Sequence, residues 1–183
     1  MSHWLPRTAR ALFVPALLVA VGASAHAAGG LGFLQIVRDG AGVDGLQGAR
    51  GIAVSSDGTS VYAVGDLDDA VAIFRRDPTS GRVGFVGREK NDTNGVSGLD
   101  RVRGVVISPD GNHVYATGNR DDAVVVFRRN PATGGLAFVE RERDGLGDVT
   151  GLDGPEGIAV SPDGLHLYVA AVEGRAVVVF TRD

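Results

Sequence analysis

One segment occurs three times at a fixed spacing, and this repeat constrains the fold more than any other feature of the sequence. Gly51–Gly58 (GIAVSSDG), Gly104–Gly111 (GVVISPDG) and Gly157–Gly164 (GIAVSPDG) begin 53 residues apart each time. In each copy an apolar, β-branched run leads into a turn signal, because Pro and Asp initiate turns and Gly accepts positive φ. Each copy therefore predicts a short strand followed by a tight turn.

Each repeat continues into further short strands, and no helical period appears after the N-terminal leader described below. The first strands are predicted at 51–55, 104–108 and 157–161, the second at 61–65, 114–118 and 167–171, and the third at 70–76, 123–129 and 176–182. A fourth strand is predicted at 81–88 and 134–143. Residues 29–38 (GGLGFLQIVR) match 134–143 (GGLAFVERER) and predict a lone fourth strand ahead of the first repeat.

These strands predict an all-β chain built from β-propeller blades, which are four-stranded antiparallel sheets, here with a 53-residue repeat. The third strands are almost wholly apolar, as in Ala-Val-Val-Val-Phe, which indicates a sheet covered on both faces. The expected layout is a leader at 1–27 and a repeat domain at 28–183. Within that domain we expect blades at 51–91 and 104–144, and a blade without a fourth strand at 157–183, so about three blades form a partial propeller.

The N-terminus has the features of a secretory signal peptide. Arg7 and Arg10 form a basic region, Ala11–Val21 is apolar, and Ala25-His26-Ala27 is a cleavage signal. We therefore expect an exported protein, periplasmic or secreted, with no membrane attachment once the leader is removed. The formal net charge is −4, or −6 without the two leader arginines, and no basic patch is visible, so nucleic acid is not an expected partner.

Two stretches of the central repeat carry a family resemblance. Ser108–Tyr115 reads SPDGNHVY and Asp121–Val139 reads DDAVVVFRRNPATGGLAFV. This pattern resembles the lactonase-like β-propellers, which include 6-phosphogluconolactonases, carboxymuconate cyclases and YVTN surface-type propellers. The resemblance covers residues 29–183. It implies a fold of about seven blades and an activity on lactones, although a fold alone does not fix a function.

Three blades are fewer than this resemblance implies, and the sequence leaves three interpretations open. The sequence is a fragment of a longer gene, or a short chain that closes by association, or an open set of blades with exposed faces. In the second case two chains give six blades with their fourth strands exchanged. We favour truncation of a larger ancestor with closure by self-association, so the expected partners are a second copy of the chain or another protein.

The candidate site lies where the loops before the first strands meet the loops between second and third strands, since a propeller places both on one face. Arg50, Arg103 and Glu156 occupy equivalent positions ahead of the first strands. The other candidates are Asp66, Asp121 and Glu173 in the second set of loops. An Arg fork suits a carboxylate or phosphate, which makes a small-molecule ligand conceivable. The alternative, which we favour, is that these residues pair with the acids of neighbouring blades, for instance in the second set of loops.

No metal and no cofactor are predicted, and no catalytic residue is assigned. Asp68-Asp69 and Asp121-Asp122 repeat ahead of a third strand, which favours turn capping over acid–base work. Asp144, Asp148 and Asp153 share one Gly-rich loop but lack the spacing of a calcium loop. The chain also has no cysteine and no Walker, Rossmann or nucleophile-elbow motif.

The resemblance implies a Pro-Arg-His ahead of a first strand, and this sequence does not carry it. The three positions read Ala49-Arg50-Gly51, Val102-Arg103-Gly104 and Pro155-Glu156-Gly157. Because the His is absent, our leading prediction is an exported binding or interaction module rather than an enzyme. The alternative is a lactonase or cycloisomerase-like enzyme acting on a cyclic sugar acid. A third interpretation is a nonfunctional gene remnant.

Overall fold

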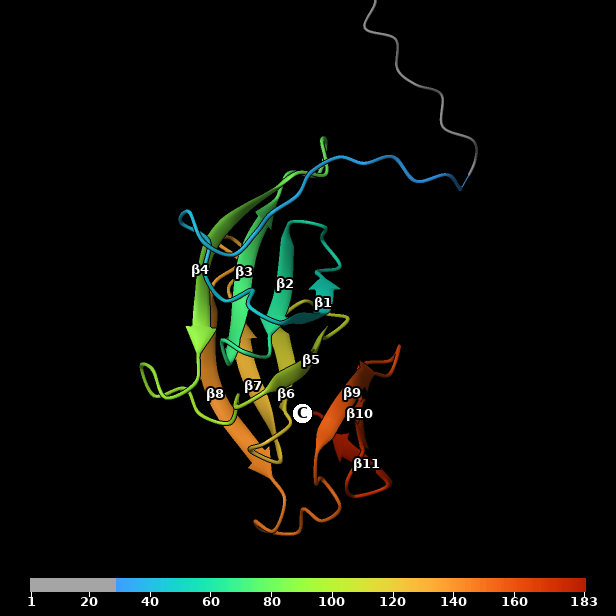
Figure 1. Cartoon of the computed structure of the whole chain (residues 1–183). Helices are drawn as coiled ribbons and strands as arrows, with labels where there is room; N and C mark the ends of the chain where they lie inside the picture. Colours follow the sequence, from blue (N-terminus) through green and yellow to red (C-terminus); the bar gives the residue numbers. More distant parts are fainter. Residues whose placement is uncertain (1–28) are drawn as a thin grey trace, which may run out of the picture. The chain divides into compact units, whose positions relative to one another are not determined.

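The computed structural model describes residues 29–183, so the predicted leader at 1–27 lies outside the described residues. Residues 29–183 contain eleven strands and no helix, arranged in three antiparallel sheets (Figure 1). Because these residues form no helix, they contain no helix that is long and apolar enough to cross a membrane. The prediction of an all-β chain with about three propeller blades is confirmed.

Each sheet is one blade, and its strands follow chain order. Blade 1 contains β1 (Ala49–Val54), β2 (Ser60–Gly65), β3 (Ala70–Arg76) and β4 (Val83–Lys90). Blade 2 contains β5 (Val102–Ile107), β6 (His113–Gly118), β7 (Ala123–Arg129) and β8 (Leu136–Arg143). Blade 3 contains β9 (Pro155–Val160), β10 (His166–Ala171) and β11 (Ala176–Thr181), with β11 at the sheet edge.

The lone fourth strand predicted at 29–38 does not form. This stretch contains no strand, although its sequence matches that of β8. A strand needs a neighbouring strand to satisfy its backbone groups, and here the contact with the edge strand β4 is made by a side chain instead. The Gln35 amide donates to the Val83 carbonyl at 2.9 Å and accepts from the Val83 N–H at 3.0 Å. The sequence is that of a strand, but its strand partner is missing.

The blades pack face to face through apolar side chains. Between blades 1 and 2, the buried cluster includes Tyr62 and Val71 on one side and Val105 and Val125 on the other. A second cluster joins Tyr115 and Val124 of blade 2 to residues of β9 and β10 in blade 3. Strands β2 and β3 are buried along most of their length, as expected for a sheet covered on both faces. A third cluster lies on the other face of blade 1, where Val37, Val43 and Leu46 pack.

A buried arginine also ties each blade to the one before it. Arg129 at the end of β7 donates to the Tyr62 hydroxyl of blade 1 at 3.1 Å and to Asp57 at 2.8 Å. The same contact recurs 53 residues later, where Arg182 donates to the Tyr115 hydroxyl at 2.5 Å. The repeat therefore encodes a repeated contact between blades as well as repeated strands.

Candidate functional site

The candidate site is built by a β-bulge near the start of β1, β5 and β9, which are the innermost strands of the three blades. In β5 one extra residue stands between Val102 and Gly104, and that residue is Arg103. In β9 the corresponding bulge contains Glu156, and in β1 it contains Arg50 and Gly51. A bulge re-aims the side chain that it carries. The predicted strands begin two residues too late because the alternation of side chains gives no sign of these bulges.

A glycine after Arg50, Arg103 and Glu156 lets the innermost strands of neighbouring blades approach closely. A Cβ on Gly104 would lie 2.4 Å from the Glu156 carbonyl oxygen, and a Cβ on Gly51 would lie 2.8 Å from that of Arg103. Both distances are below any normal contact, so these positions accept only glycine without rearrangement. The close approach brings the three bulges side by side.

Three arginines converge on one buried carboxylate at this point. Arg50 Nε donates to Asp66 Oδ2 at 2.6 Å, and Arg101 Nη1 donates to Asp66 Oδ1 at 3.2 Å. Arg103 Nε lies 3.4 Å from Asp66 Oδ2, while its Nη1 donates to Glu156 Oε1 at 3.0 Å. We call these five residues the arginine cluster: Arg50, Arg101, Arg103, Asp66 and Glu156.

The cluster carries more positive than negative charge and keeps hydrogen-bond donors in reserve. The Asp66 side chain is only 3% exposed, whereas Arg50 is 49% exposed. Burial raises the pKa of Asp66, but the hydrogen bonds and charges of Arg50 and Arg101 outweigh it and hold the pKa below its ordinary value. Arg103 Nε is buried and makes no hydrogen bond of good geometry. Three guanidinium groups against two carboxylates can therefore still accept an anion.

Sequence reasoning missed Arg101. Its backbone has φ +55°, and the equivalent residues Gly48 and Gly154 have φ +70° and +64°. Glycine is the ordinary residue for this conformation. The aligned repeats have an arginine at one position where the other two have glycine, and this difference is the sequence signal for Arg101. The strained backbone brings a third guanidinium to Asp66.

The structure brings four of the six predicted site residues together and leaves two apart. Arg50, Arg103, Glu156 and Asp66 belong to the arginine cluster. Within it the arginines form ion pairs with Asp66 and Glu156, which is the kind of pairing that the sequence analysis set against ligand binding. The Asp121 carboxylate instead accepts the backbone N–H of Asp100 at 2.9 Å. Glu173 packs against Gly154, where a Cβ would lie 2.9 Å from its Cγ. Neither of these two residues touches Asp66.

The paired aspartates hold the loops that precede the innermost strands. Asp68 caps the Gln47 N–H of its own blade at 2.8 Å, as Asp121 does for Asp100. The second aspartate of each pair reaches the next blade. Asp69 accepts from the Arg101 N–H at 2.8 Å, and Asp122 accepts from the Gly154 N–H at 3.0 Å. Backbone capping by aspartate is thus present, but it fixes neighbouring loops rather than only its own turn.

One group of carboxylates has the composition of a cation site. Oxygens of Asp39, Asp44 and Asp68 lie within 4.8 Å of one another. Each carboxylate already has a partner, however, since Asp39 accepts from the Leu46 N–H, Asp68 from the Gln47 N–H, and Asp44 pairs with Arg88 at 2.6 Å. The local contacts explain this group without a bound ion.

Histidine lies away from the arginine cluster. His113 and His166 occupy the first positions of β6 and β10. The cluster is at the other end of these strands, because Val102 is paired with Gly118 at the far end of β6. In the described part of the chain, the chemistry available at the cluster is therefore that of guanidinium and carboxylate groups.

Comparison with known proteins identifies what the chain is similar to. The model of the family described as "Lactonase, 7-bladed beta-propeller" matches residues 28–183. A 6-phosphogluconolactonase of Formosa agariphila is 27% identical over 138 residues, which is 74% of this chain and 36% of that protein. The chain thus spans a little over a third of the length of this relative.

Solved structures of proteins described as lactonases are also similar to this chain. A Pseudomonas aeruginosa periplasmic gluconolactonase, PpgL, is 28% identical with a TM-score of 0.62, over 74% of this chain and 36% of that one. A Bacteroides uniformis protein provisionally described as a 6-phosphogluconolactonase is 25% identical with a TM-score of 0.65, over 78% of this chain and 38% of that one.

These relatives correct our leading functional prediction. The sequence favoured a binding or interaction module because no His precedes an innermost strand. That prediction is wrong, since the named relatives are lactonases and therefore enzymes. The arginine cluster draws its residues from several blades, so the absence of a histidine before each innermost strand is not evidence against an enzyme.

Proposed function

This chain belongs to the lactonase family of seven-bladed β-propellers, and on that premise we propose that it acts in the hydrolysis of a sugar-acid lactone. In this reaction water adds to the lactone carbonyl carbon, the ring C–O bond breaks, and a hydroxy acid is formed. The observation that carries the proposal is the family match over residues 28–183, reinforced by relatives named for this activity.

The arginine cluster supports a role in binding the negative charge of substrate and transition state. The tetrahedral intermediate of ester hydrolysis carries an oxyanion, and preorganised donors stabilise it most when they are fixed in place beforehand. Asp66 fixes Arg50 and Arg101 in this way, at 2.6 and 3.2 Å. A phosphate or carboxylate on the sugar suits the same guanidinium groups. The proposed substrate class is therefore an acidic sugar lactone such as 6-phosphogluconolactone.

We also propose that the protein is exported. The basic region, apolar run and Ala25-His26-Ala27 signal support this placement. One structural relative is itself described as a periplasmic gluconolactonase. Localising a tagged full-length chain by cell fractionation tests this point, with recovery in the periplasm or medium expected and recovery in the cytoplasm as the contradicting result.

The activity is tested by following acid release from 6-phosphogluconolactone and from unphosphorylated gluconolactone. Both lactones hydrolyse spontaneously, so a protein-free blank is subtracted at each concentration. The expected result is a rate above the blank that saturates with substrate, with the phosphorylated lactone preferred because of the cluster's excess positive charge. A rate equal to the blank with both lactones would contradict the proposal.

A further inference from the structure

The three bulges carry two arginines and one glutamate at equivalent positions. Arg50, Arg103 and Glu156 follow one another at intervals of 53 residues, so the sign of the charge is reversed in blade 3 alone. A bulge re-aims the side chain that it carries. Here it brings Arg103 and Glu156 together, with Arg103 Nη1 donating to Glu156 Oε1 at 3.0 Å. The reversal therefore places a carboxylate directly beside the guanidinium groups.

Hydrolysis of a lactone needs a base that takes a proton from the attacking water. The base must have a lone pair that this water can reach at hydrogen-bond distance. The arginines do not qualify, because a guanidinium stays protonated and accepts no hydrogen bond. Asp66 does not qualify either, because its side chain is 3% exposed and its two oxygens already face three guanidinium groups. Glu156 is the remaining carboxylate of the arginine cluster.

Glu156 meets the conditions for a base. Its side chain is 42% exposed. Its Oε1 accepts from Arg103, while its Oε2 accepts no hydrogen bond from residues 29–183. The bulge position stays open to solvent even between two blades, since Arg103, with a blade on either side, still has 24% of its side chain exposed. Water can therefore reach the free oxygen of Glu156.

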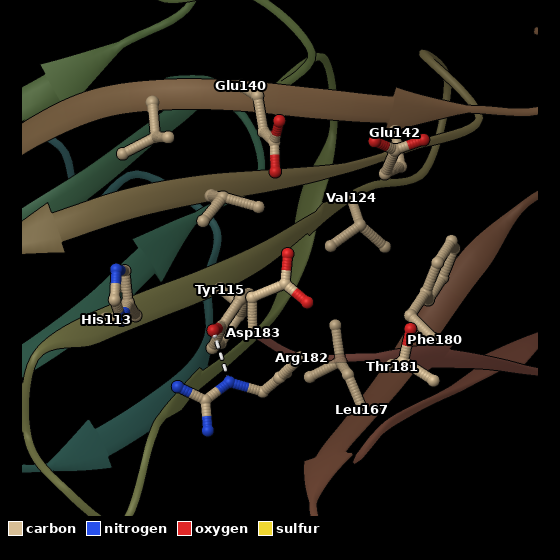
Figure 2. A pocket seen from close by; sticks show the side chains of 12 residues that line it. His113, Tyr115, Val124, Glu140, Glu142, Leu167, Phe180, Thr181, Arg182 and Asp183 are labelled. Carbon is tan, nitrogen blue, oxygen red and sulfur yellow. Dashed lines mark hydrogen bonds between the residues drawn. The ribbon is translucent and has the colours of Figure 1, made fainter. Parts of the chain in front are cut away.

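Another group of acids and a histidine lies away from this point. Figure 2 shows His113, Glu140 and Glu142 around one pocket. His113 is the first residue of β6, whereas the bulge of Arg103 lies beside Gly118 at the other end of that strand. The two glutamates belong to β8, at the opposite edge of the sheet from β5. These side chains cannot act on a substrate held by the arginine cluster.

We propose that Glu156 is the general base of lactone hydrolysis, an inference that rests on the proposed function. Water gives a proton to the Glu156 carboxylate as its oxygen bonds to the lactone carbonyl carbon, and the carbonyl oxygen becomes the oxyanion. The oxyanion then re-forms the double bond, the ring C–O bond breaks, and the leaving ring oxygen takes the proton from Glu156. The carboxylate is regenerated, and one water has been consumed.

Arg103 couples the base to the groups that bind the oxyanion. Its Nη1 holds Glu156, and its Nε lies 3.4 Å from Asp66, which also holds Arg50 and Arg101. The proton acceptor and the cationic donors therefore lie side by side. This is the arrangement that a reaction needs when a proton leaves the nucleophile while negative charge develops on the carbonyl oxygen.

Thr117 is a positioning residue for this pair. Its side chain is fully buried, and its Oγ1 accepts from the Gly104 N–H at 2.8 Å and donates to the Glu156 carbonyl at 3.0 Å. One hydroxyl thus ties the backbone next to Arg103 to the backbone of Glu156. The equivalent residues of the other blades are Val64 and Ala170, which have no hydroxyl. The tie occurs only where arginine and glutamate meet.

The steady-state kinetics of Glu156→Gln test the base directly. Glutamine keeps the shape of the side chain but cannot take the proton. With the lactone that the wild type hydrolyses faster, kcat is expected to fall about 100-fold while KM changes by less than about threefold. Glu140→Gln is the matched control, because Glu140 is exposed on β8, and it should keep the wild-type kcat.

The outcomes separate this inference from the proposed function. A Glu156→Gln variant with the wild-type kcat overturns the role of Glu156 and leaves lactone hydrolysis standing. A wild type with no rate above the protein-free blank contradicts the proposed function, and the role of Glu156 with it.

Chemical rescue distinguishes a base from a residue that only holds Arg103. Glu156→Ala removes the carboxylate and leaves room for a small one, so added formate is expected to raise the kcat of this variant about tenfold and to leave the wild-type kcat unchanged. Circular dichroism shows that the variant is folded. A folded Glu156→Ala whose lowered kcat does not respond to formate overturns the proposal.

Thr117→Val and Thr117→Ser test the positioning role. Valine keeps the shape and is the residue that blade 1 has at this position, whereas serine keeps the hydroxyl. We expect Thr117→Val to lower kcat about tenfold with little change in KM, since a misplaced base slows the chemical step. Thr117→Ser should keep the wild-type kcat. Equal kcat values for the two variants overturn the positioning role of Thr117.

Discussion

Arg129 Nε donates a 3.1 Å hydrogen bond to the hydroxyl of Tyr62, and this contact joins the end of β7 in blade 2 to the middle of β2 in blade 1. The same guanidinium reaches Asp57, Ser60 and the Gly111 carbonyl. Its side chain is 1% exposed, so the charge is fully desolvated and depends on these partners. The repeat thus places a buried, fully paired cation between adjacent blades.

Arg129→Ala is therefore expected to destabilise the protein strongly. The substitution leaves the buried hydroxyls of Tyr62 and Ser60 without this donor, and each buried polar group that loses its partner costs about 1–3 kcal/mol. Denaturant unfolding measures the change. Arg128→Ala is the matched control, since Arg128 is exposed on the same strand and its loss is expected to change stability by less than about 0.5 kcal/mol. Similar effects of the two substitutions would contradict this account.

Gly104→Ala is expected to disturb the packing of the innermost strands. The added methyl would lie 2.4 Å from the Glu156 carbonyl oxygen and 2.9 Å from Thr117 Oγ1. Blades 2 and 3 must then separate, which we expect to cost about 1–3 kcal/mol. Thermal unfolding measures the loss. Gly84→Ala, where nothing lies within 4 Å, is the control, and a Gly104→Ala variant as stable as this control would contradict the close approach.

Arg101→Gly separates backbone strain from function. Glycine relieves the φ +55° conformation, which costs on the order of 1 kcal/mol for a residue with a side chain. It also removes the Arg101 donor from Asp66. We expect stability to change little while the catalytic efficiency towards a phosphorylated lactone falls at least tenfold. Unchanged activity in a folded variant would show that Arg101 serves structure alone.

Asp66 gives the protein a pH-dependent contribution to stability. Because its pKa is lower in the folded protein than the ordinary 3.8, the unfolded chain binds more protons as the solution is acidified. The contribution of Asp66 is present above pH 3.8 and is lost as pH falls through the folded pKa. Asp66→Asn should therefore lower the free energy of unfolding at pH 7, by about 1.5–3 kcal/mol for the lost hydrogen bonds to a charged group. Denaturant titrations should show this difference shrinking below pH 3.8, and a difference that does not change with pH would contradict the ionised state of Asp66.

The repeat made most of the fold predictable, because strand content and turn residues are local properties of the chain. Gly104–Gly111 carries both a β-branched run and its turn, so the strands were found within about two residues of their bounds. The bulge at Arg103 was not predictable, because one extra residue does not change the apolar pattern. The prediction of a strand at 29–38 was wrong for a different reason. A strand forms only beside another strand that pairs with its backbone, and a local pattern does not reveal that neighbour.

The candidate site was only partly predictable. Arg50, Arg103 and Glu156 emerged from their equivalent positions, and their grouping follows from the propeller geometry. Arg101 stayed hidden because its role depends on a left-handed backbone at a position where the other repeats have glycine. The convergence of three arginines on Asp66 comes from two blades at once, and no single repeat contains that information.

The most direct test of the central claim is the steady-state kcat/KM for 6-phosphogluconolactone, measured on the wild-type chain and on Arg103→Ala with Arg128→Ala as the charge-matched control. Arg103 holds a buried Nε without a hydrogen bond in the cluster, whereas Arg128 is exposed on β7. If the arginine cluster stabilises the developing oxyanion, Arg103→Ala loses about 100-fold in kcat/KM while Arg128→Ala keeps the wild-type value. Equal kcat/KM values for all three proteins, or no hydrolysis above the blank by the wild type, would contradict the claim.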